Sequence, residues 1–154
     1  MKLNYRKYGK GQPLIILHGL LGMSDNWIQP AKILAEDFKV FLPDLRNHGL
    51  SPHDDEHSYS RMSEDIEEFI LGHSLEKVFL AGHSMGGKTA MMFADKYPQL
   101  LRKLIVIDIS PAAYEQRDLS SLKANHFDIL NFMNDFDIHM MKNRRDLYNA
   151  ASII

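Results

Sequence analysis

The chain has 154 residues, of which 45% are hydrophobic and 25% are charged, and its formal net charge at pH 7 is −2. This composition is typical of a soluble globular domain, and the small net charge argues against a nucleic-acid or anionic membrane partner. The absence of cysteine excludes disulfides and cysteine-ligated metals and suits a reducing compartment, so we expect a cytoplasmic protein. The first residues lack the apolar core of a signal peptide, and no apolar run is long enough to span a membrane.

Four short apolar runs predict the buried strands of a sheet. Each is rich in Val, Ile, Leu or Phe and nearly continuous, which is typical of strands covered on both faces and therefore of a parallel sheet. The four runs are residues 14–17, 39–43, 77–81 and 103–108. A stretch near residues 2–8 alternates more strongly and fits an edge strand.

Helical patterns lie between these runs, at residues 24–38, 58–73 and 85–97. Pro30 must lie near the first turn of the first helix, because proline lacks the N–H that a helix interior requires. Strands that alternate with helices of this length build an α/β fold, in which a mostly parallel sheet carries helices on both faces. Catalytic groups in such sheets lie at the carboxyl ends of the strands.

Residues 82–89, GHSMGGKT, fit two motifs that both follow a strand and begin a helix. Read as G-x-x-x-x-G-K-[ST], the stretch would bind a nucleotide phosphate, and Asp108 at the end of an apolar strand would fit the Mg²⁺ ligand of that class. Against this reading, Met85 lies where a loop that wraps a phosphate needs small residues. Read as G-x-S-x-G, the stretch forms the sharp turn that presents a nucleophilic serine.

The serine turn explains more of the residues than the phosphate loop does. Gly82 and Gly86 flank Ser84 at the positions where larger side chains would collide with neighbouring structure. The backbone N–H of Met85 would then face the oxygen that becomes negative during attack. A second N–H for this oxyanion hole is expected from Leu20, in the loop after the first buried run.

Four motifs, in their order and spacing, resemble the α/β-hydrolase superfamily. More closely, they resemble a bacterial esterase subgroup that cleaves acyl esters and acyl thioesters, including acyl-CoA-type substrates. The resemblance covers roughly residues 3–115. The motifs are HGLLG at 18–22, DLRNHGLSP at 44–52, GHSMGGK at 82–88 and IDISP at 107–111.

The resemblance implies that Ser84 is the nucleophile and Asp108 the acid of a catalytic triad, acting on a small acyl ester or thioester without a metal or other cofactor. It also implies that residues 1–112 are the N-terminal part of the hydrolase core, truncated after about the sixth strand. Residues 113–154, which are polar and rich in Met, would begin a helical lid. The plainer alternatives are a helix N-cap for Ser84 and a turn-capping role for Asp108.

Other motif residues are expected to support the site. The loop at residues 17–22 that contains Leu20 is called the oxyanion loop, and His18 and Gly19 would shape it. Residues 44–51 would brace the site through hydrogen bonds. His83 should point away from Ser84, because neighbours along a strand face opposite sides, so we expect it to shape the pocket floor rather than to act as the base. The commonest superfamily pattern has Gly where this chain has Asn47.

The histidine base of this superfamily follows the last strand. His126 and His139 fall in the predicted lid, so neither is assigned as the base. We therefore expect the base to lie outside this chain, and the 154 residues alone to be inactive and prone to form homo-oligomers or exchange strands. The alternatives are a catalytically inactive binding protein and another reaction on the same fold.

Overall fold

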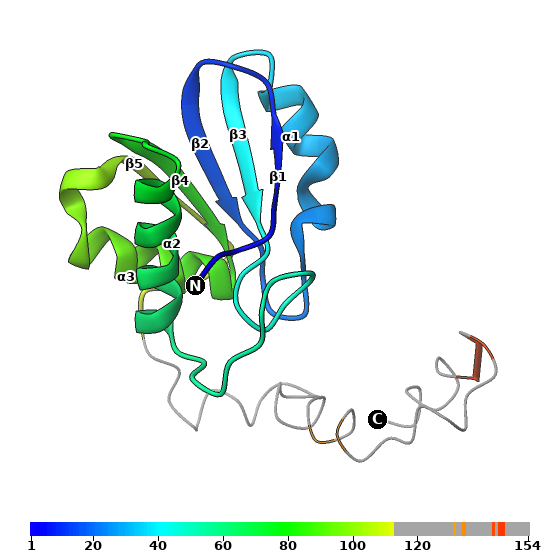
Figure 1. Cartoon of the computed structure of the whole chain (residues 1–154). Coiled ribbons are helices and arrows are strands. Elements are labelled where there is room, and N and C mark those ends of the chain that lie inside the picture. Colours follow the sequence, from blue (N-terminus) through cyan, green and yellow to red (C-terminus); the bar gives the residue numbers. More distant parts are fainter. Residues whose placement is uncertain (113–130, 132–133, 135–142, 144, 147–154) are drawn as a thin grey trace. The chain divides into compact units, whose positions relative to one another are not determined.

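The computed structural model describes residues 1–112, together with residues 131, 134, 143, 145 and 146 (Figure 1). The chain divides into two compact units, Met1–Pro111 and Ala112–Ile154. Every strand and helix named below belongs to the first unit. His126, His139 and most of the segment predicted as a lid lie outside the described residues.

The first unit is built on a five-stranded sheet with the order β1-β3-β2-β4-β5. β1 pairs antiparallel with β3, and the other three pairs are parallel. This confirms a mostly parallel sheet with the 2–8 stretch at an edge, and the described residues hold five strands where about six were expected. The strands are β1 (Tyr5–Tyr8), β2 (Gln12–Leu17), β3 (Phe38–Pro43), β4 (Val78–His83) and β5 (Leu101–Ile107).

The helices lie between the strands, as predicted, but the first is shorter than expected. The 24–38 pattern divides into a 3-10 turn, η1 (Ser24–Trp27), and a short helix, α1 (Ile28–Leu34). Pro30 is the third residue of α1, where its missing N–H costs no helical hydrogen bond. The remaining elements are α2 (Tyr59–Gly72), α3 (Met85–Lys96) and the 3-10 turn η2 (Pro98–Leu100). In the described part of the chain, no helix is long and apolar enough to cross a membrane.

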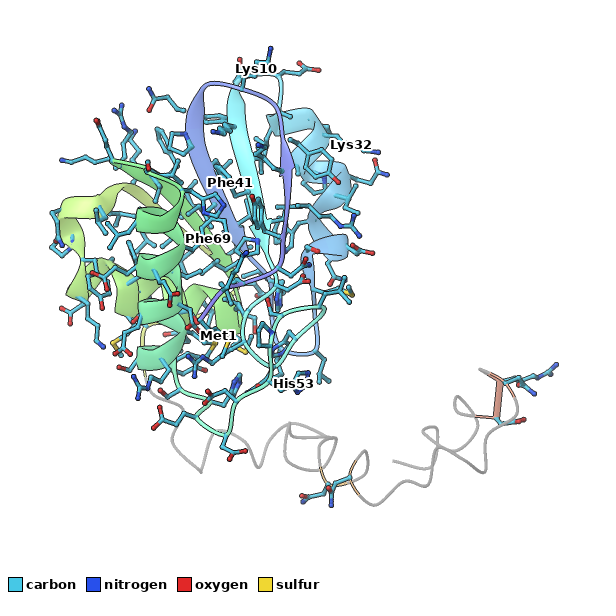
Figure 2. The ribbon with its side chains drawn as sticks, viewed as in Figure 1. Met1, Lys10, Lys32, Phe41, His53 and Phe69 are labelled. Carbon is cyan, nitrogen blue, oxygen red and sulfur yellow. The ribbon has the colours of Figure 1, made fainter. Side chains whose placement is uncertain are left out.

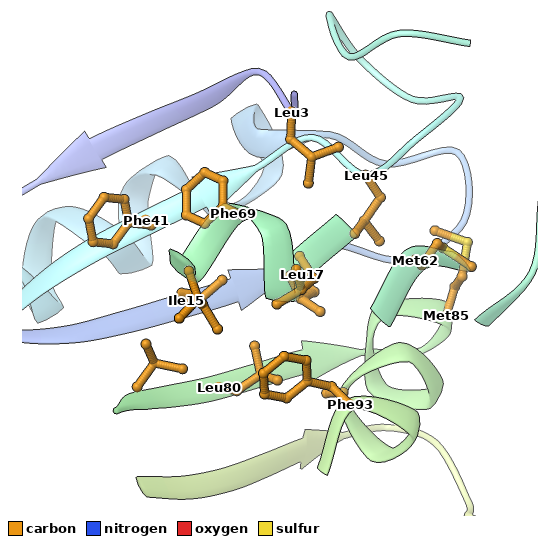
Figure 3. Close-up of a cluster of buried hydrophobic side chains, with 14 residues drawn as sticks. Leu3, Ile15, Leu17, Phe41, Leu45, Met62, Phe69, Leu80, Met85 and Phe93 are labelled. Carbon is orange, nitrogen blue, oxygen red and sulfur yellow. The ribbon is translucent and has the colours of Figure 1, made fainter. Parts of the chain in front are cut away.

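Alternate residues of each central strand are buried on opposite faces of the sheet. Ile15 and Leu17 of β2 belong to a cluster with residues of α2 and α3, whereas Leu14 and Ile16 pack in a second cluster on the α1 side. Figure 3 shows the first cluster, which includes Leu80 of β4 and Phe93 of α3. Both faces are therefore covered, which explains why the apolar runs are continuous rather than alternating.

Candidate active site

The carboxyl ends of the four parallel-paired strands place one polar side chain each at the same edge of the sheet. His18, Asp44, Ser84 and Asp108 are the residues that directly follow β2, β3, β4 and β5. Figure 2 shows His53 of the loop after β3 near this edge and Lys10 of the β1–β2 turn at the opposite end. The four motifs, far apart in sequence, therefore converge where catalytic groups of α/β sheets lie.

Ser84 has a strained backbone at the start of α3. Its φ is 51° and its ψ is −116°, a region that residues with a side chain rarely adopt. The turn is held from both sides: the Ser84 N–H donates to the Ile107 carbonyl at 3.1 Å, and the Ser84 carbonyl accepts from the Gly87 N–H at 2.9 Å. The Ser84 side chain does not cap α3, so its hydroxyl is not used to hold the helix.

The glycines around Ser84 are required by close contacts. A Cβ at Gly82 would overlap the Gly86 carbonyl, and a Cβ at Gly86 would lie 2.6 Å from the carbonyl oxygens of Leu17 and His18. Gly87, which belongs to the phosphate-loop motif and not to the serine-turn motif, is also in close contact: a Cβ there would lie 2.5 Å from the Ile109 side chain. This contact joins the first turn of α3 to the residues after β5, so the sequence around Gly87 does not indicate it.

The same geometry argues against the phosphate-loop interpretation of residues 82–89. α3 begins at Met85, so Gly86, Gly87 and Lys88 lie in its first turn. A phosphate loop needs a run of non-helical residues between its first glycine and its lysine, whose N–H groups can wrap the phosphate. Here only His83 and Ser84 separate Gly82 from the helix, and His83 is still in β4.

Met85 has its side chain in the core and its backbone at the end of β4. The thioether is buried among the cluster residues beside Met62, as Figure 3 shows. As the first residue of α3, Met85 has an N–H without an acceptor inside the helix. This N–H at a helix N-terminus is suited to stabilise a negative oxygen on a carbon atom that Ser84 Oγ has attacked.

His18 holds the predicted oxyanion loop in place as a neutral ring. The Leu45 N–H donates to His18 Nε2 at 3.0 Å, so the proton is on Nδ1, which donates to the Gly19 carbonyl at 2.8 Å. Burial lowers the pKa of His18, and the hydrogen bond to Gly19 opposes this only in part. With both nitrogens engaged, His18 is a structural residue rather than a base.

Asp44 holds the start of η1, which closely follows the oxyanion loop. Its fully buried carboxylate accepts from the Ser24 N–H at 2.7 Å, the Leu50 N–H at 3.0 Å and Asn4 Nδ2 at 2.8 Å. Burial alone would raise the pKa of Asp44, but these hydrogen bonds outweigh it and lower the pKa. Gly49 has a φ of 56°, and a Cβ there would overlap the Asp44 carboxylate.

The loop after β3 carries a second buried charge. Arg46 forms a two-point ion pair with Asp65 of α2, with Nε to Oδ2 at 2.6 Å and a terminal nitrogen to Oδ1 at 2.9 Å. Asn47, where the commonest pattern has Gly, has a φ of 64°. Asn tolerates this left-handed conformation better than most residues, and its amide bonds to the backbone of Asp54 stabilise the turn.

A cavity of about 450 Å³ lies beside the oxyanion loop. Leu20, 37% exposed, and Trp27 contribute apolar surface to it, and His83 contributes a polar ring. A Cβ at Gly19 would lie 3.4 Å from Ser84 Cβ, so the loop runs directly past the serine. The cavity is lined by His18, Gly19, Leu20, Leu21, Gly22, Asn26, Trp27 and His83.

Asp108 lies one strand away from Ser84 and close to His83. His83 Nε2 and Asp108 Oδ2 are 3.8 Å apart, and the Asp108 side chain is 87% exposed. The structure thus brings Ser84, Met85, Leu20, His83 and Asp108 to one edge of the sheet. Across the described residues, no group of three or more His, Asp or Glu side chains is arranged to hold a metal ion.

Comparisons with known proteins identify the family and the fold. A putative esterase/lipase of Haemophilus influenzae is 48% identical over 102 residues, which are 66% of this chain and 36% of that protein. A Xenopus tropicalis protein named sn-1-specific diacylglycerol lipase ABHD11 is 45% identical over 105 residues, which are 67% of this chain and 33% of that protein. Among solved structures, a marine microorganism esterase has a TM-score of 0.90 and 45% identity, over 98% of this chain and 57% of that one.

The chain therefore spans about a third of the length of these two curated relatives. A family model described as alpha/beta hydrolase fold matches residues 12–149, which include all four motifs at the strand ends. That match extends over most of the chain, and the structural neighbour shares its sheet. The chain belongs to the α/β-hydrolase family.

Proposed function

We propose that this chain carries the nucleophile, the oxyanion hole and the acid of a serine hydrolase that cleaves carboxylic esters. The observation that carries the proposal is the backbone of Ser84, with a φ of 51° between two glycines that close contacts require. Strain of this kind persists where function needs it. The turn presents the Ser84 hydroxyl, which forms no capping hydrogen bond with α3.

In the proposed mechanism, Ser84 Oγ attacks the ester carbonyl carbon and gives its proton to a histidine base. The N–H groups of Met85 and Leu20 stabilise the negative oxygen of the tetrahedral intermediate. The intermediate collapses to an acyl-enzyme, and the alcohol leaves with the proton from the histidine. Water then repeats the sequence and releases the acid, while Asp108 orients the histidine.

The histidine base is proposed to lie outside this chain, with residues 113–154 forming the start of a lid over the site. Neither His126 nor His139 is assigned to the role. The 154 residues alone are then expected to turn substrate over poorly or not at all, because Ser84 without a base is a weak nucleophile.

For the substrate, an ester with an uncharged acyl group fits best. The cavity beside the oxyanion loop, which His83 also lines, has apolar surface from Leu20, Leu21 and Trp27. The relatives named above are an esterase/lipase and a lipase of diacylglycerol, which is itself a carboxylic ester. The same attack would also cleave a thioester, and comparing matched p-nitrophenyl and thiophenyl esters of one acid would establish the preference.

A fluorophosphonate probe that modifies activated serines tests the proposal. We expect the longest natural form of the protein that contains this chain to gain one adduct by intact mass, and Ser84→Ala to gain none. Lys88→Ala, which would disable a phosphate loop, should leave labelling unchanged. An adduct that survives in Ser84→Ala would refute the assignment of the nucleophile. A folded full-length form that never gains an adduct would instead favour a binding protein without catalysis.

A further inference from the structure

His83 lies inside the candidate site, yet the mechanism proposed above gives it no role. It is the last residue of β4 and directly precedes Ser84. Its ring lines the cavity beside Trp27, with the two ring centres 6.3 Å apart. The side chain is 39% exposed, so it is neither a core residue nor a free surface residue.

The two nitrogens of His83 face two different parts of the site. A Cβ built at Gly19 would lie 3.0 Å from His83 Nδ1, which places this side of the ring against the oxyanion loop. The other nitrogen, Nε2, lies 3.8 Å from Asp108 Oδ2. The ring therefore fills the space between the oxyanion loop and the carboxylate, and Gly19 allows it to fit there.

Asp108 needs such a neighbour more than a buried acid would. In the part of the chain that the structure describes, its carboxylate is 87% exposed, so burial does not fix its direction. The register pairs His83 with Ile107 across β4 and β5, so the Asp108 backbone lies immediately beyond the His83 partner. An approach by His83 to Oδ2 leaves Oδ1 available to accept the N–H of the histidine base.

We propose that His83 is a positioning residue, which restrains the Asp108 carboxylate so that its second oxygen orients the base. This inference rests on the proposed serine-hydrolase function and adds a fourth side chain to the triad. At 3.8 Å the two atoms are beyond hydrogen-bond distance, so the restraint requires the exposed Asp108 side chain to turn slightly toward a donor at the place of Nε2. A glutamine side chain can supply that donor, whereas a methionine of similar length cannot.

The test compares His83→Gln and His83→Met in the longest active form, with p-nitrophenyl butyrate as substrate. We expect His83→Met to lower kcat by about 5- to 10-fold, the effect of one lost polar contact, with KM changed less than about twofold. His83→Gln should retain most of the activity. His53→Gln, in an exposed loop, is the matched control and should behave as the wild type. Melting temperatures of all variants establish that they are folded.

The deciding step repeats both substitutions in an Asp108→Asn background. If His83 acts through Asp108, His83→Met should lower the residual rate no further, because the carboxylate that it restrains is absent. Ser84→Ala in the same background should abolish that residual rate, which shows that it arises from the site.

Three outcomes would overturn the inference: an equal loss from His83→Met in both backgrounds, an effect on KM alone, or equal losses from Gln and Met. Each would make His83 a pocket-lining residue. Failure of the proposed function gives a different result, since Ser84→Ala alone would then retain full turnover.

Discussion

The loop after β3 and the turn after β4 leave the same edge of the sheet and have opposite local properties. In the loop, two charged side chains, Asp44 and Arg46, are buried and each is matched by several partners. In the turn, Ser84 has a strained backbone and a hydroxyl that does not cap the helix behind it. The loop is stabilised by buried polar contacts, whereas the turn is strained and carries the proposed nucleophile.

This difference indicates how the site tolerates its strain. A residue in a sparsely populated conformation costs about 1–3 kcal/mol and persists only when its surroundings impose it. Around Ser84 the surroundings are glycines in close contact and a backbone hydrogen bond to Ile107. The oxyanion loop beside it is held by His18, and the start of η1 just after that loop is held by Asp44. Substitutions in the turn should therefore change activity, and substitutions in the loop should change stability.

Ser84→Ala should produce the largest effect on activity and almost none on stability. In the longest active form, loss of the nucleophile is expected to lower ester hydrolysis by about 10³-fold or more. Because the side chain is not a helix cap, the free energy of unfolding should change by less than about 0.5 kcal/mol. Ser84→Gly should also be inactive, but more stable, since glycine accepts a positive φ without strain. Stability below wild type for Ser84→Gly would contradict the assignment of strain.

Asp44→Ala should show the reverse pattern. It leaves the Ser24 N–H, the Leu50 N–H and the Asn4 amide without their acceptor, so we expect a loss of about 3–5 kcal/mol in urea unfolding. Asp55→Ala, in the exposed part of the same loop, should change stability by less than about 0.5 kcal/mol. Equal effects of the two substitutions would show that the buried hydrogen bonds do not hold the loop.

Gly86→Ala and Gly72→Ala form a matched pair for the close contacts. At Gly86 the new methyl meets two carbonyl oxygens at 2.6 Å, so a loss of about 1–3 kcal/mol is expected, together with a disturbed turn. At Gly72 no atom lies within 4 Å, and alanine should stabilise α2 by about 0.5–1 kcal/mol. Thermal melts of both variants test the pair, and a destabilised Gly72→Ala would be inconsistent with the open space there.

The pH dependence of stability should be the smallest effect. His18 has a lowered pKa in the folded protein. Its contribution to the free energy of unfolding is therefore complete above the ordinary pKa of 6.5 and declines as the pH falls below that value. The pKa of Asp44 is also lowered in the folded protein, so its contribution to stability likewise declines as the pH falls, beginning near its ordinary pKa of 3.8. Urea midpoints between pH 7.5 and 5 should fall for the wild type, and the part due to His18 should be absent in His18→Asn. An identical slope in both proteins would exclude His18.

Much of this arrangement can be predicted from the sequence, because the relevant signals are local. Continuous apolar runs predict the parallel strands, and the spacing of Gly82, Ser84 and Gly86 predicts the sharp turn. The long-range contacts are not predictable in this way. Neither the closeness of His83 to Asp108 nor the hydrogen bonds of Asp44 to Asn4 and Ser24 can be read from neighbouring residues, since these contacts join segments that are distant in the sequence.

Two local features also differ from the sequence prediction for physical reasons. The 24–38 pattern predicts one helix, but the chain makes a 3-10 turn before α1, so that Pro30 falls within the first turn of α1. α1 then ends at Leu34, because β3 begins at Phe38 and the chain must reverse direction between them. The spacing of hydrophobic residues indicates neither the 3-10 turn before α1 nor the chain reversal before β3.

The single carboxylate of Asp44 also has a consequence for the order in which the chain opens. It accepts hydrogen bonds from amides at Ser24 and Leu50, which belong to segments on either side of β3, and from Asn4 ahead of β1. Because one group protects both amides, the Ser24 and Leu50 protons should exchange with deuterated solvent in the same opening event. The start of η1, just after the oxyanion loop, and the loop after β3 would then open as one cooperative unit, although they are far apart in the sequence.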